Sequence, residues 1–134
     1  MLQQLKRYAE KGINKIGFLD IETQGSGFSA NKAYMISWVL EIMDVKTGKI
    51  ETVYDIVNKD DLKKANRKMF KEPKLRTVRP YDVNILETLI DNMRKCDLIV
   101  THYGTWFDIP MIRTRAKMQN IPMITHSDKI RFAD

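Results

Sequence analysis

A short apolar stretch that ends in two carboxylates constrains the fold of this chain more than any other part of the sequence. Residues 16–19 read Ile-Gly-Phe-Leu, which is typical of a strand buried on both faces. Asp20 and Glu22 follow, and because side chains alternate along a strand, both carboxylates point to the same side of the sheet. Adjacent carboxylates repel each other unless a cation or a proton lies between them. The stretch therefore predicts an oxygen-ligand site for a hard divalent ion, or a strand that simply ends in solvent.

The size and composition of the chain indicate a single globular domain over residues 1–134. Its length is sufficient for a hydrophobic core, and the 43% hydrophobic and 30% charged residues argue against a disordered chain. No apolar run is long enough to span a bilayer, and residues 1–15 have no signal-peptide core. The single cysteine, Cys96, excludes an intramolecular disulfide and fits a reducing compartment. We therefore expect a cytoplasmic protein with no membrane partner.

The net charge of +6 lies entirely in one segment, residues 58–81. The segments 1–57 and 82–134 each hold seven basic and seven acidic side chains, whereas residues 58–81 hold nine basic and three acidic ones. We expect this segment to be a basic insertion that projects from the domain, because it has too few apolar residues for a core of its own. A basic segment near a carboxylate cluster favours a polyanion held beside a metal. The alternative is a solvated, lysine-rich helix face.

The hydrophobic periodicity predicts the order of strands and helices. The expected strands cover residues 16–22, 33–43, 50–57, 97–101 and 129–133. The expected helices cover residues 3–11, 60–70, 83–95 and 107–119. The second and third strands should form an antiparallel hairpin, and the helical crossover 83–95 should make strand 97–101 parallel to strand 16–22. The predicted fold is an α/β mixed sheet, in which three antiparallel strands precede parallel strands.

Single residues predict details of this framework. Thr23 to Gly27 contains two glycines and should form a turn whose backbone can approach a ligand. Asp82 should cap the helix 83–95, Cys96 should pack in the core, and Trp106 should pack beside the site. The helix 60–70 should bury an apolar stripe, which consists of Leu62, Ala65, Met69 and Phe70.

Asp108 connects the second half of the chain with the two carboxylates of the first strand. It lies at the start of the helix that follows strand 97–101. If that strand lies beside strand 16–22, Asp108 comes near Asp20 and Glu22 at one edge of the sheet. Three converging carboxylates would be unstable without cations, so the arrangement argues for bound metal. Taken alone, Asp108 is also explained by the preference of the helix dipole for an acid in the first turn.

Two short motifs contain these three carboxylates, and Asp108 lies 86 positions after Glu22. Residues 18–23 read Phe-Leu-Asp-Ile-Glu-Thr, and residues 102–110 read His-Tyr-Gly-Thr-Trp-Phe-Asp-Ile-Pro. In this order they resemble the first and second motifs of the DEDD-type 3′–5′ exonucleases, which have a ribonuclease H-like fold. Phe107 to Pro110 looks close to the proofreading domains of family B polymerases and related nucleases. The expected order of elements fits the same fold over nearly the whole chain.

The resemblance implies a metal-dependent 3′–5′ exonuclease that hydrolyses phosphodiester bonds by a two-metal mechanism. Asp20, Glu22 and Asp108 would be both the catalytic residues and the ligands of two Mg²⁺ or Mn²⁺ ions. The implied partner is the single-stranded 3′ end of a nucleic acid, DNA rather than RNA. The implied strand-binding residues lie in the two motifs and in the basic segment: Thr23, Tyr103, Phe107, Lys63, Lys64, Arg67 and Lys68.

The sequence departs from the family pattern in two places. Tyr103 stands where the second motif usually has Asn, and the third motif, which supplies a fourth Asp, is absent; Asp134 comes too early for that role but is expected near the site. We therefore expect a chain without the family's closing C-terminal helices, whose open sheet face invites a homodimer or the missing segment. The alternatives to an exonuclease are a non-catalytic nucleic-acid-binding domain that keeps the fold and a ribonuclease H-like endonuclease.

Overall fold

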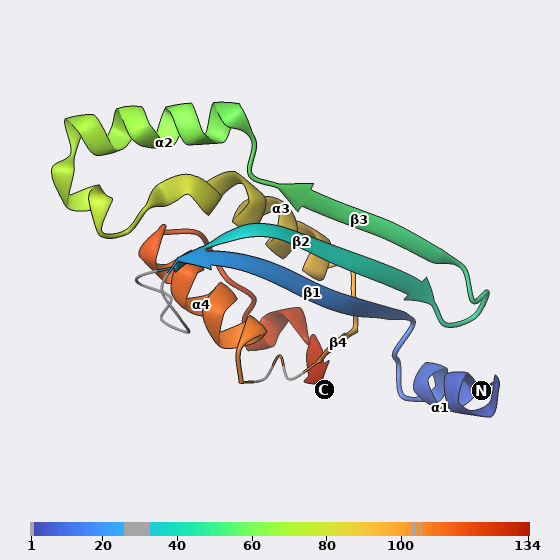
Figure 1. Ribbon diagram of the computed structural model, residues 1–134. Helices are drawn as coiled ribbons and strands as arrows, with labels where there is room; N and C mark the ends of the chain where they lie inside the picture. The colour runs from blue at the N-terminus through green and yellow to red at the C-terminus, as the bar shows by residue number, and fades with distance from the viewer. Residues whose placement is uncertain (1, 26–32, 103, 105) are drawn as a thin grey trace.

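A five-stranded mixed sheet lies at the centre of the fold (Figure 1). The computed structural model describes residues 2–25, 33–102, 104 and 106–134. The strands are β1 (Lys15–Gly25), β2 (Ala33–Asp44), β3 (Ile50–Ile56), β4 (Leu98–Thr101) and β5 (Arg131–Ala133). The α-helices are α1 (Leu2–Glu10), α2 (Lys59–Lys71), α3 (Val83–Met93) and α4 (Asp108–Met118). Three short 3₁₀ helices complete the elements: η1 (Pro73–Arg76), η2 (Pro80–Asp82) and η3 (His126–Asp128).

The strands lie side by side in the order β3-β2-β1-β4-β5. β2 is antiparallel to both β1 and β3, whereas β4 is parallel to both β1 and β5. The expected hairpin and the expected helical crossover are therefore both present. This arrangement confirms the α/β class with a mixed sheet flanked by helices.

The main hydrophobic core lies between one face of the sheet and the helices α3 and α4. Leu19 and Ile21 of β1 point to this face and pack with Trp38 and Leu40 of β2. Trp38 is buried as well, and its indole N–H donates a 2.8 Å hydrogen bond to the carbonyl oxygen of Ile85 in α3. Burial of each such large side chain stabilises the fold by about 1.5–3 kcal/mol, so this layer fixes the position of β1 and of the residues that follow Leu19.

The opposite face of the sheet is covered only in part within the described residues. A second, smaller core formed by Ile13, Ile16, Val45 and Leu98 packs against Leu5 and Ala9 of α1. Farther along the strands, several large apolar side chains are exposed: Phe18, Val39, Ile50, Tyr54 and Ile56. Because side chains alternate along β1, Asp20 and Glu22 project from this second face.

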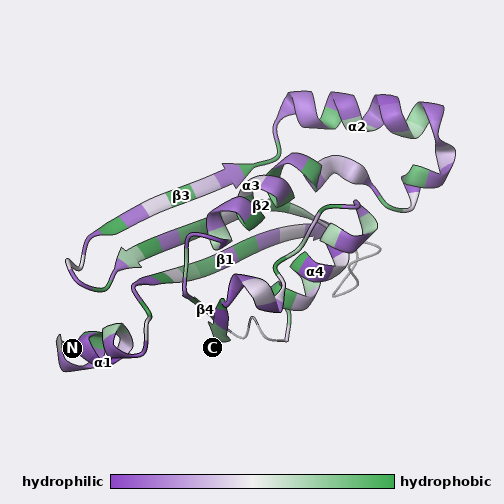
Figure 2. Ribbon diagram, turned by 180° about the vertical axis from the view of Figure 1, so that it is seen from behind, coloured by the Kyte–Doolittle hydropathy of each residue, from purple (hydrophilic) through white to green (hydrophobic). Residues whose placement is uncertain are grey.

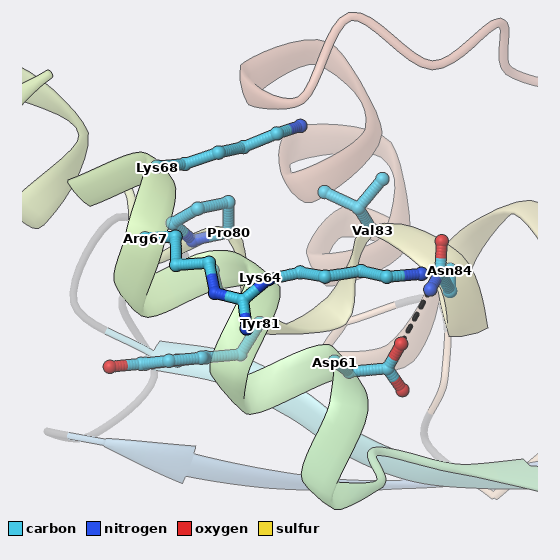
Figure 3. A pocket seen from close by; sticks show the side chains of 9 residues that line it. Asp61, Lys64, Arg67, Lys68, Pro80, Tyr81, Val83 and Asn84 are labelled. Carbon is cyan, nitrogen blue, oxygen red and sulfur yellow. Dashed lines mark hydrogen bonds between the residues drawn. The ribbon is translucent and has the colours of Figure 1, made fainter. Parts of the chain in front are cut away.

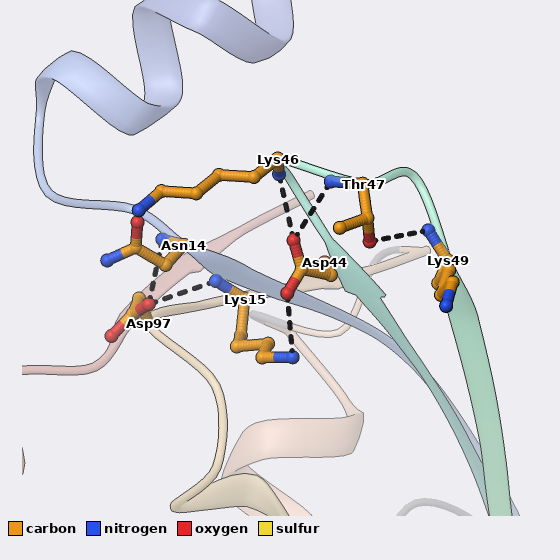
Figure 4. A network of polar contacts seen from close by, with 7 residues as sticks. All are labelled: Asn14, Lys15, Asp44, Lys46, Thr47, Lys49 and Asp97. Atoms are coloured by element: carbon orange, nitrogen blue, oxygen red, sulfur yellow. Dashed lines mark hydrogen bonds and ion pairs between the residues drawn. The ribbon is translucent and has the colours of Figure 1, made fainter.

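Hydrogen bonds join the first residue of β1 to the end of β2 and to the residue before β4 (Figure 4). The Asp97 carboxylate accepts a 3.0 Å bond from the Lys15 N–H, and Asp44 accepts a 3.0 Å bond from the Lys15 ammonium group. This ammonium bond, with further bonds from the backbone N–H groups of Thr47 and Lys46, lowers the pKa of Asp44 to about 2. The hairpin turns at Gly48, whose φ of 72° lies in the left-handed region that glycine adopts without strain.

The basic helix α2 begins with a capping box. The Asn58 side chain accepts a 2.9 Å bond from the backbone N–H of Asp61, and the Asp61 carboxylate accepts a bond from the N–H of Asn58. α2 lies beside η2 and away from the strands, and its surface is mostly hydrophilic (Figures 1 and 2). The expected apolar stripe was wrong: only Ala65 is buried, whereas Leu62 is exposed and Phe70 is 81% exposed. The helix has little core to pack against, so its contacts cannot bury a full stripe.

Asp82 occupies the N-cap position of α3, as expected, but its side chain makes no capping hydrogen bond to the helix. Its carboxylate is fully buried and accepts hydrogen bonds from the Arg115 guanidinium at 2.7 and 2.9 Å. It also accepts a 2.9 Å bond from the backbone N–H of Met35. A buried charge needs partners more strongly than a helix needs a cap, because an unpaired buried carboxylate costs several kcal/mol. Asp82 therefore joins α4, β2 and the start of α3.

Two further expectations concern turns and packing. Thr23 to Gly25 belongs to β1 rather than to a turn, since the pairing with β2 continues to Gly25; residues 26 and 27 of the expected turn lie outside the described residues. Cys96 is buried in the main core, as expected, and its burial raises the pKa of the thiol to about 11. Among the described residues, no helix has the length and apolar character needed to cross a membrane.

Candidate functional site

The site begins where β1 extends beyond its neighbour β4. The last residue of β4, Thr101, lies opposite Leu19, so Asp20 is the first residue of β1 without a partner on that side. Asp20 and Glu22 are both exposed and point to the same face. The register between β1 and β2 shifts between Glu22 and Thr23, and such bulges bend a strand and re-aim its side chains.

The connection from β4 to α4 brings Asp108 to the same edge. Asp108 is the first residue of α4, and the residue as a whole is only 7% exposed. The carbonyl oxygen of Gly104 accepts a 2.8 Å bond from the N–H of Ile109, which fixes the start of the helix. A side chain at Gly104 would overlap the side chain of Thr101, so only glycine allows the connection to pass this close to β4.

Asp134 supplies a fourth carboxylate. It directly follows β5, whose Ala133 lies opposite Val100 of β4. The hydroxyl of Thr101 donates a 3.2 Å hydrogen bond to the Asp134 carboxylate. The ends of β1, β4 and β5 therefore each place a polar side chain at one edge of the sheet, and the start of α4 adds Asp108.

Three of the carboxylates act electrostatically on the fourth, Asp108. Burial raises the pKa of Asp108, and the negative charges of Asp20, Asp134 and Glu22 raise it further, to about 6. A carboxyl group surrounded by three others ionises with difficulty, because each neighbour opposes a further negative charge. Asp20 and Glu22 of the first motif thus lie close enough to act on Asp108 of the second.

The donor set suits a hard divalent cation, which prefers carboxylate oxygens. A bound cation would also relieve the repulsion that raises the pKa of Asp108. In the described ranges, however, no three Asp, Glu, His or Cys side chains converge closely enough to enclose an ion. Asp20 and Glu22 are exposed, so their side chains can change rotamer without disturbing the core.

The other residues expected at the site lie in different surroundings. Thr23 is half-buried at the bulge, and Phe107 is half-buried against the main core. Tyr103 lies outside the described residues. Trp106 was expected to pack beside the site, but it is 85% exposed. Four basic side chains of the expected strand-binding set lie on the exposed surface of α2: Lys63, Lys64, Arg67 and Lys68.

Sequence reasoning undervalued Asp134 and overlooked Arg115. The place of Asp134 depends on how β5 pairs with β4, and a three-residue strand gives too little periodicity to fix that register. The sequence feature that pointed to Asp134 was its position directly after strand 129–133, which was expected to be one of the parallel strands. Arg115 is fully buried on α4, and its neighbours in the sequence give no sign of its carboxylate partner 33 residues away.

Comparisons with known proteins identify the superfamily to which this chain belongs. The family model of the RNase H superfamily matches residues 17–134, and the chain belongs to this superfamily. Among solved structures, the chain is similar to the family B DNA polymerase from the hyperthermophilic archaeon Pyrobaculum calidifontis, with a TM-score of 0.56 and 16% sequence identity. The match covers 87% of this chain but only 13% of the polymerase chain, and at this identity it shows the fold alone. A search of curated protein sequences found no match.

Proposed function

We propose that this chain is a metal-dependent 3′–5′ exonuclease domain that hydrolyses phosphodiester bonds of nucleic acid. The observation that carries the proposal is the group of four carboxylates at one sheet edge, in which Asp20, Glu22 and Asp134 raise the pKa of Asp108. A domain that only binds nucleic acid gains nothing from crowded negative charges near a polyanion. Membership of the RNase H superfamily and the two motifs support the same reaction class.

Each carboxylate has a distinct place in the proposed reaction. Asp20 would contact both metal ions, Glu22 would hold one ion and face the terminal 3′-hydroxyl, and Asp108 would hold the other. Two bound Mg²⁺ or Mn²⁺ ions would supply an activated water and neutralise the charge on the leaving oxygen. Asp134, oriented by the hydroxyl of Thr101, is the fourth acidic side chain available for this site.

The proposed substrate is a single strand that presents its 3′ end to the carboxylates, DNA rather than RNA. Trp106 is exposed two residues before Asp108, and an aromatic side chain in this position can stack on a base without regard to its identity. Four basic side chains of α2 would contact phosphates farther from the end: Lys63, Lys64, Arg67 and Lys68.

A non-catalytic strand-binding domain is the second candidate. It is favoured by one observation: among the described residues, no group of carboxylates encloses an ion in the conformation seen. This candidate shares the superfamily fold and the basic helix with the exonuclease, and differs only in the chemistry of the carboxylate edge.

Digestion of end-labelled single strands in Mg²⁺ or Mn²⁺ tests the proposal. With a 5′ label, a 3′–5′ exonuclease gives a ladder that shortens by one nucleotide at a time, and Asp20→Asn should abolish it while keeping the size of the side chain. Glu87→Gln, an exposed position in α3, is the matched control and should digest normally. Immediate appearance of internal fragments would indicate an endonuclease instead. Metal-independent binding without any shortening would establish the non-catalytic domain.

A further inference from the structure

A pocket of about 220 Å³ lies between the basic helix α2 and the start of α3 (Figure 3). One wall is formed by side chains of α2, and the facing wall by residues of η2 and the first turn of α3. The residues that determine its chemistry are Lys64, Arg67 and Lys68 from α2, Tyr81 from η2, and Asn84 from α3. The pocket is open to solvent and lies apart from the four carboxylates, none of which lines it.

The pocket has an excess of positive charge. Within the part of the chain that the structure describes, Lys64, Arg67 and Lys68 form no ion pair with an acidic side chain. The one acid that lines the pocket, Asp61, is occupied, because its carboxylate accepts bonds from the Asn58 N–H and from the Asn84 side chain. The lining of the pocket therefore carries three positive charges and one negative charge.

The orientation of α3 adds to the positive electrostatic potential of the pocket. Val83 and Asn84 open the helix and line the pocket, so the N-terminal end of α3 faces it with its partial positive charge. Tyr81 closes one side and is held in place by a 3.1 Å hydrogen bond from its hydroxyl to the Asn66 side chain. Three basic side chains from one helix, a helix N-terminus and an aromatic wall are suited to a phosphate group.

The pocket lies at the same end of the sheet as the carboxylate edge. The Tyr81 ring packs on the ring of Tyr34, with centroids 4.9 Å apart, and Tyr34 lies opposite Gln24 of β1. Gln24 is only two residues beyond Glu22. The start of α2 is also close, because Ile56 at the end of β3 pairs with Ser37, which pairs with Glu22. The pocket and the carboxylate edge are therefore connected through neighbouring residues at one end of the sheet.

We infer that the pocket binds a backbone phosphate of the nucleic-acid strand, upstream of the end that the carboxylates hold. The identity of the ligand as a strand rests on the proposed function, whereas the pocket and its charge do not. Lys64 and Lys68 lie four residues apart on one face of α2 and contact the phosphate from one side, while the Arg67 guanidinium can pair with two phosphate oxygens.

Two double variants with the same change of charge test the inference. K64Q/K68Q removes two cations from the pocket, and K59Q/K71Q removes two cations from the same helix outside it. Binding of a fluorescent single strand of about 20 nucleotides is measured by anisotropy at several salt concentrations, in EDTA to prevent digestion. The pocket variant should lose about tenfold in affinity, and its salt dependence should fall by about 0.7 for each lost contact. The control variant should lose much less.

The outcomes separate this inference from the proposed function. Equal losses of affinity in both variants would overturn the inference, because only the total charge of α2 would then matter. This conclusion would hold even if digestion is observed. A selective loss in the pocket variant would support it even if no digestion occurs, and the proposed reaction alone would fail. Displacement of the strand by polyglutamate at equal charge would also overturn the inference, because the pocket would not distinguish phosphate from carboxylate.

Discussion

At the scale of single residues, Asp108 connects the stability of the fold with the chemistry of the site. Burial and the charges of Asp20, Asp134 and Glu22 raise its pKa from 3.8 to about 6. A carboxyl group with a higher pKa in the folded state binds its proton more tightly there than in the unfolded chain. Its contribution to stability is therefore fully present below about pH 4 and is lost as the pH rises through 6.

Asp108→Asn should consequently stabilise the protein at neutral pH. We expect an increase of about 1–2 kcal/mol in the free energy of unfolding near pH 7.5, after allowance for solvent screening, and almost none near pH 4. Denaturant unfolding without divalent ions, at both pH values, measures this difference. Glu87→Gln serves as the control. A variant no more stable than the wild type at pH 7.5 would mean that the carboxylates act on Asp108 only weakly.

Gly104 is the second residue on which the geometry of the site depends. Gly104→Ala should place a methyl group into Thr101 and displace both the start of α4 and the hydroxyl that bonds Asp134. We expect a loss of about 1–3 kcal/mol in stability and a loss of digestion, whereas Pro110→Ala, an exposed change in the first turn of α4, should preserve both. Thermal unfolding and the digestion assay together report the result. Wild-type stability and activity in Gly104→Ala would show that the connection tolerates a shift.

At the scale of elements, one buried ion pair joins parts of the chain that the sheet does not hold. Arg115 of α4 bonds the carboxylate of Asp82 and the carbonyl oxygens of Val78 and Arg79 at 2.8 and 2.9 Å. The end of the basic segment is thereby tied to α4. The position of η2, and with it one wall of the proposed phosphate pocket, depends on this contact.

Removal of Arg115 should therefore be costly. Arg115→Met leaves the Asp82 carboxylate buried without its cation, and we expect a loss of about 3–5 kcal/mol in stability. Asp82→Asn in the same chain removes the unpaired charge but keeps an acceptor for the N–H of Met35. The double variant should consequently be less destabilised than the sum of the two single changes, as measured by denaturant unfolding. Strictly additive losses would contradict a direct coupling between the two side chains.

The same pair illustrates which elements could be predicted from the sequence. β1, β2 and the crossover α3 have long, regular patterns of apolar residues, and local periodicity was enough to place them. Asp82 sits where a helix cap would be expected, but its partner is distant in the sequence, and the buried ion pair determined its role. Trp106 was expected to pack beside the site, yet in the connection before α4 it is 85% exposed.

The candidate site was likewise predictable where it depends on local sequence patterns, but not where it depends on contacts between distant residues. The common direction of Asp20 and Glu22 follows from the period of a strand, and the approach of Asp108 follows from the parallel pairing of β4 with β1. The place of Asp134 required the register of β5, which no local pattern specifies. The pocket between α2 and α3 required the tertiary contact of two helices and was not accessible to sequence reasoning beyond its excess of basic residues.

At the scale of the whole molecule, charge is separated between two neighbouring regions. The net charge of +6 comes from residues 58–81, whereas four carboxylates gather at the edge formed by β1, β4, β5 and α4. Such a distribution attracts a polyanion to one region and a cation to the other. The fold retains both regions although the crowded carboxylates oppose folding at neutral pH, which is expected when a ligand normally offsets the repulsion.

Binding of a divalent cation should therefore stabilise the entire fold. Millimolar Mg²⁺ or Mn²⁺ should raise the melting temperature near pH 7.5, because an ion that binds only the folded state adds about 2.7 kcal/mol at one hundred times its dissociation constant. The increase should be smaller near pH 4.5, where Asp108 is mostly protonated and the proton competes with the metal ion for its carboxylate. Sodium chloride at equal ionic strength separates this effect from general screening. Asp20→Asn should lose most of the increase and Glu87→Gln should retain it, so an equal shift in both variants would place the ion elsewhere on the molecule.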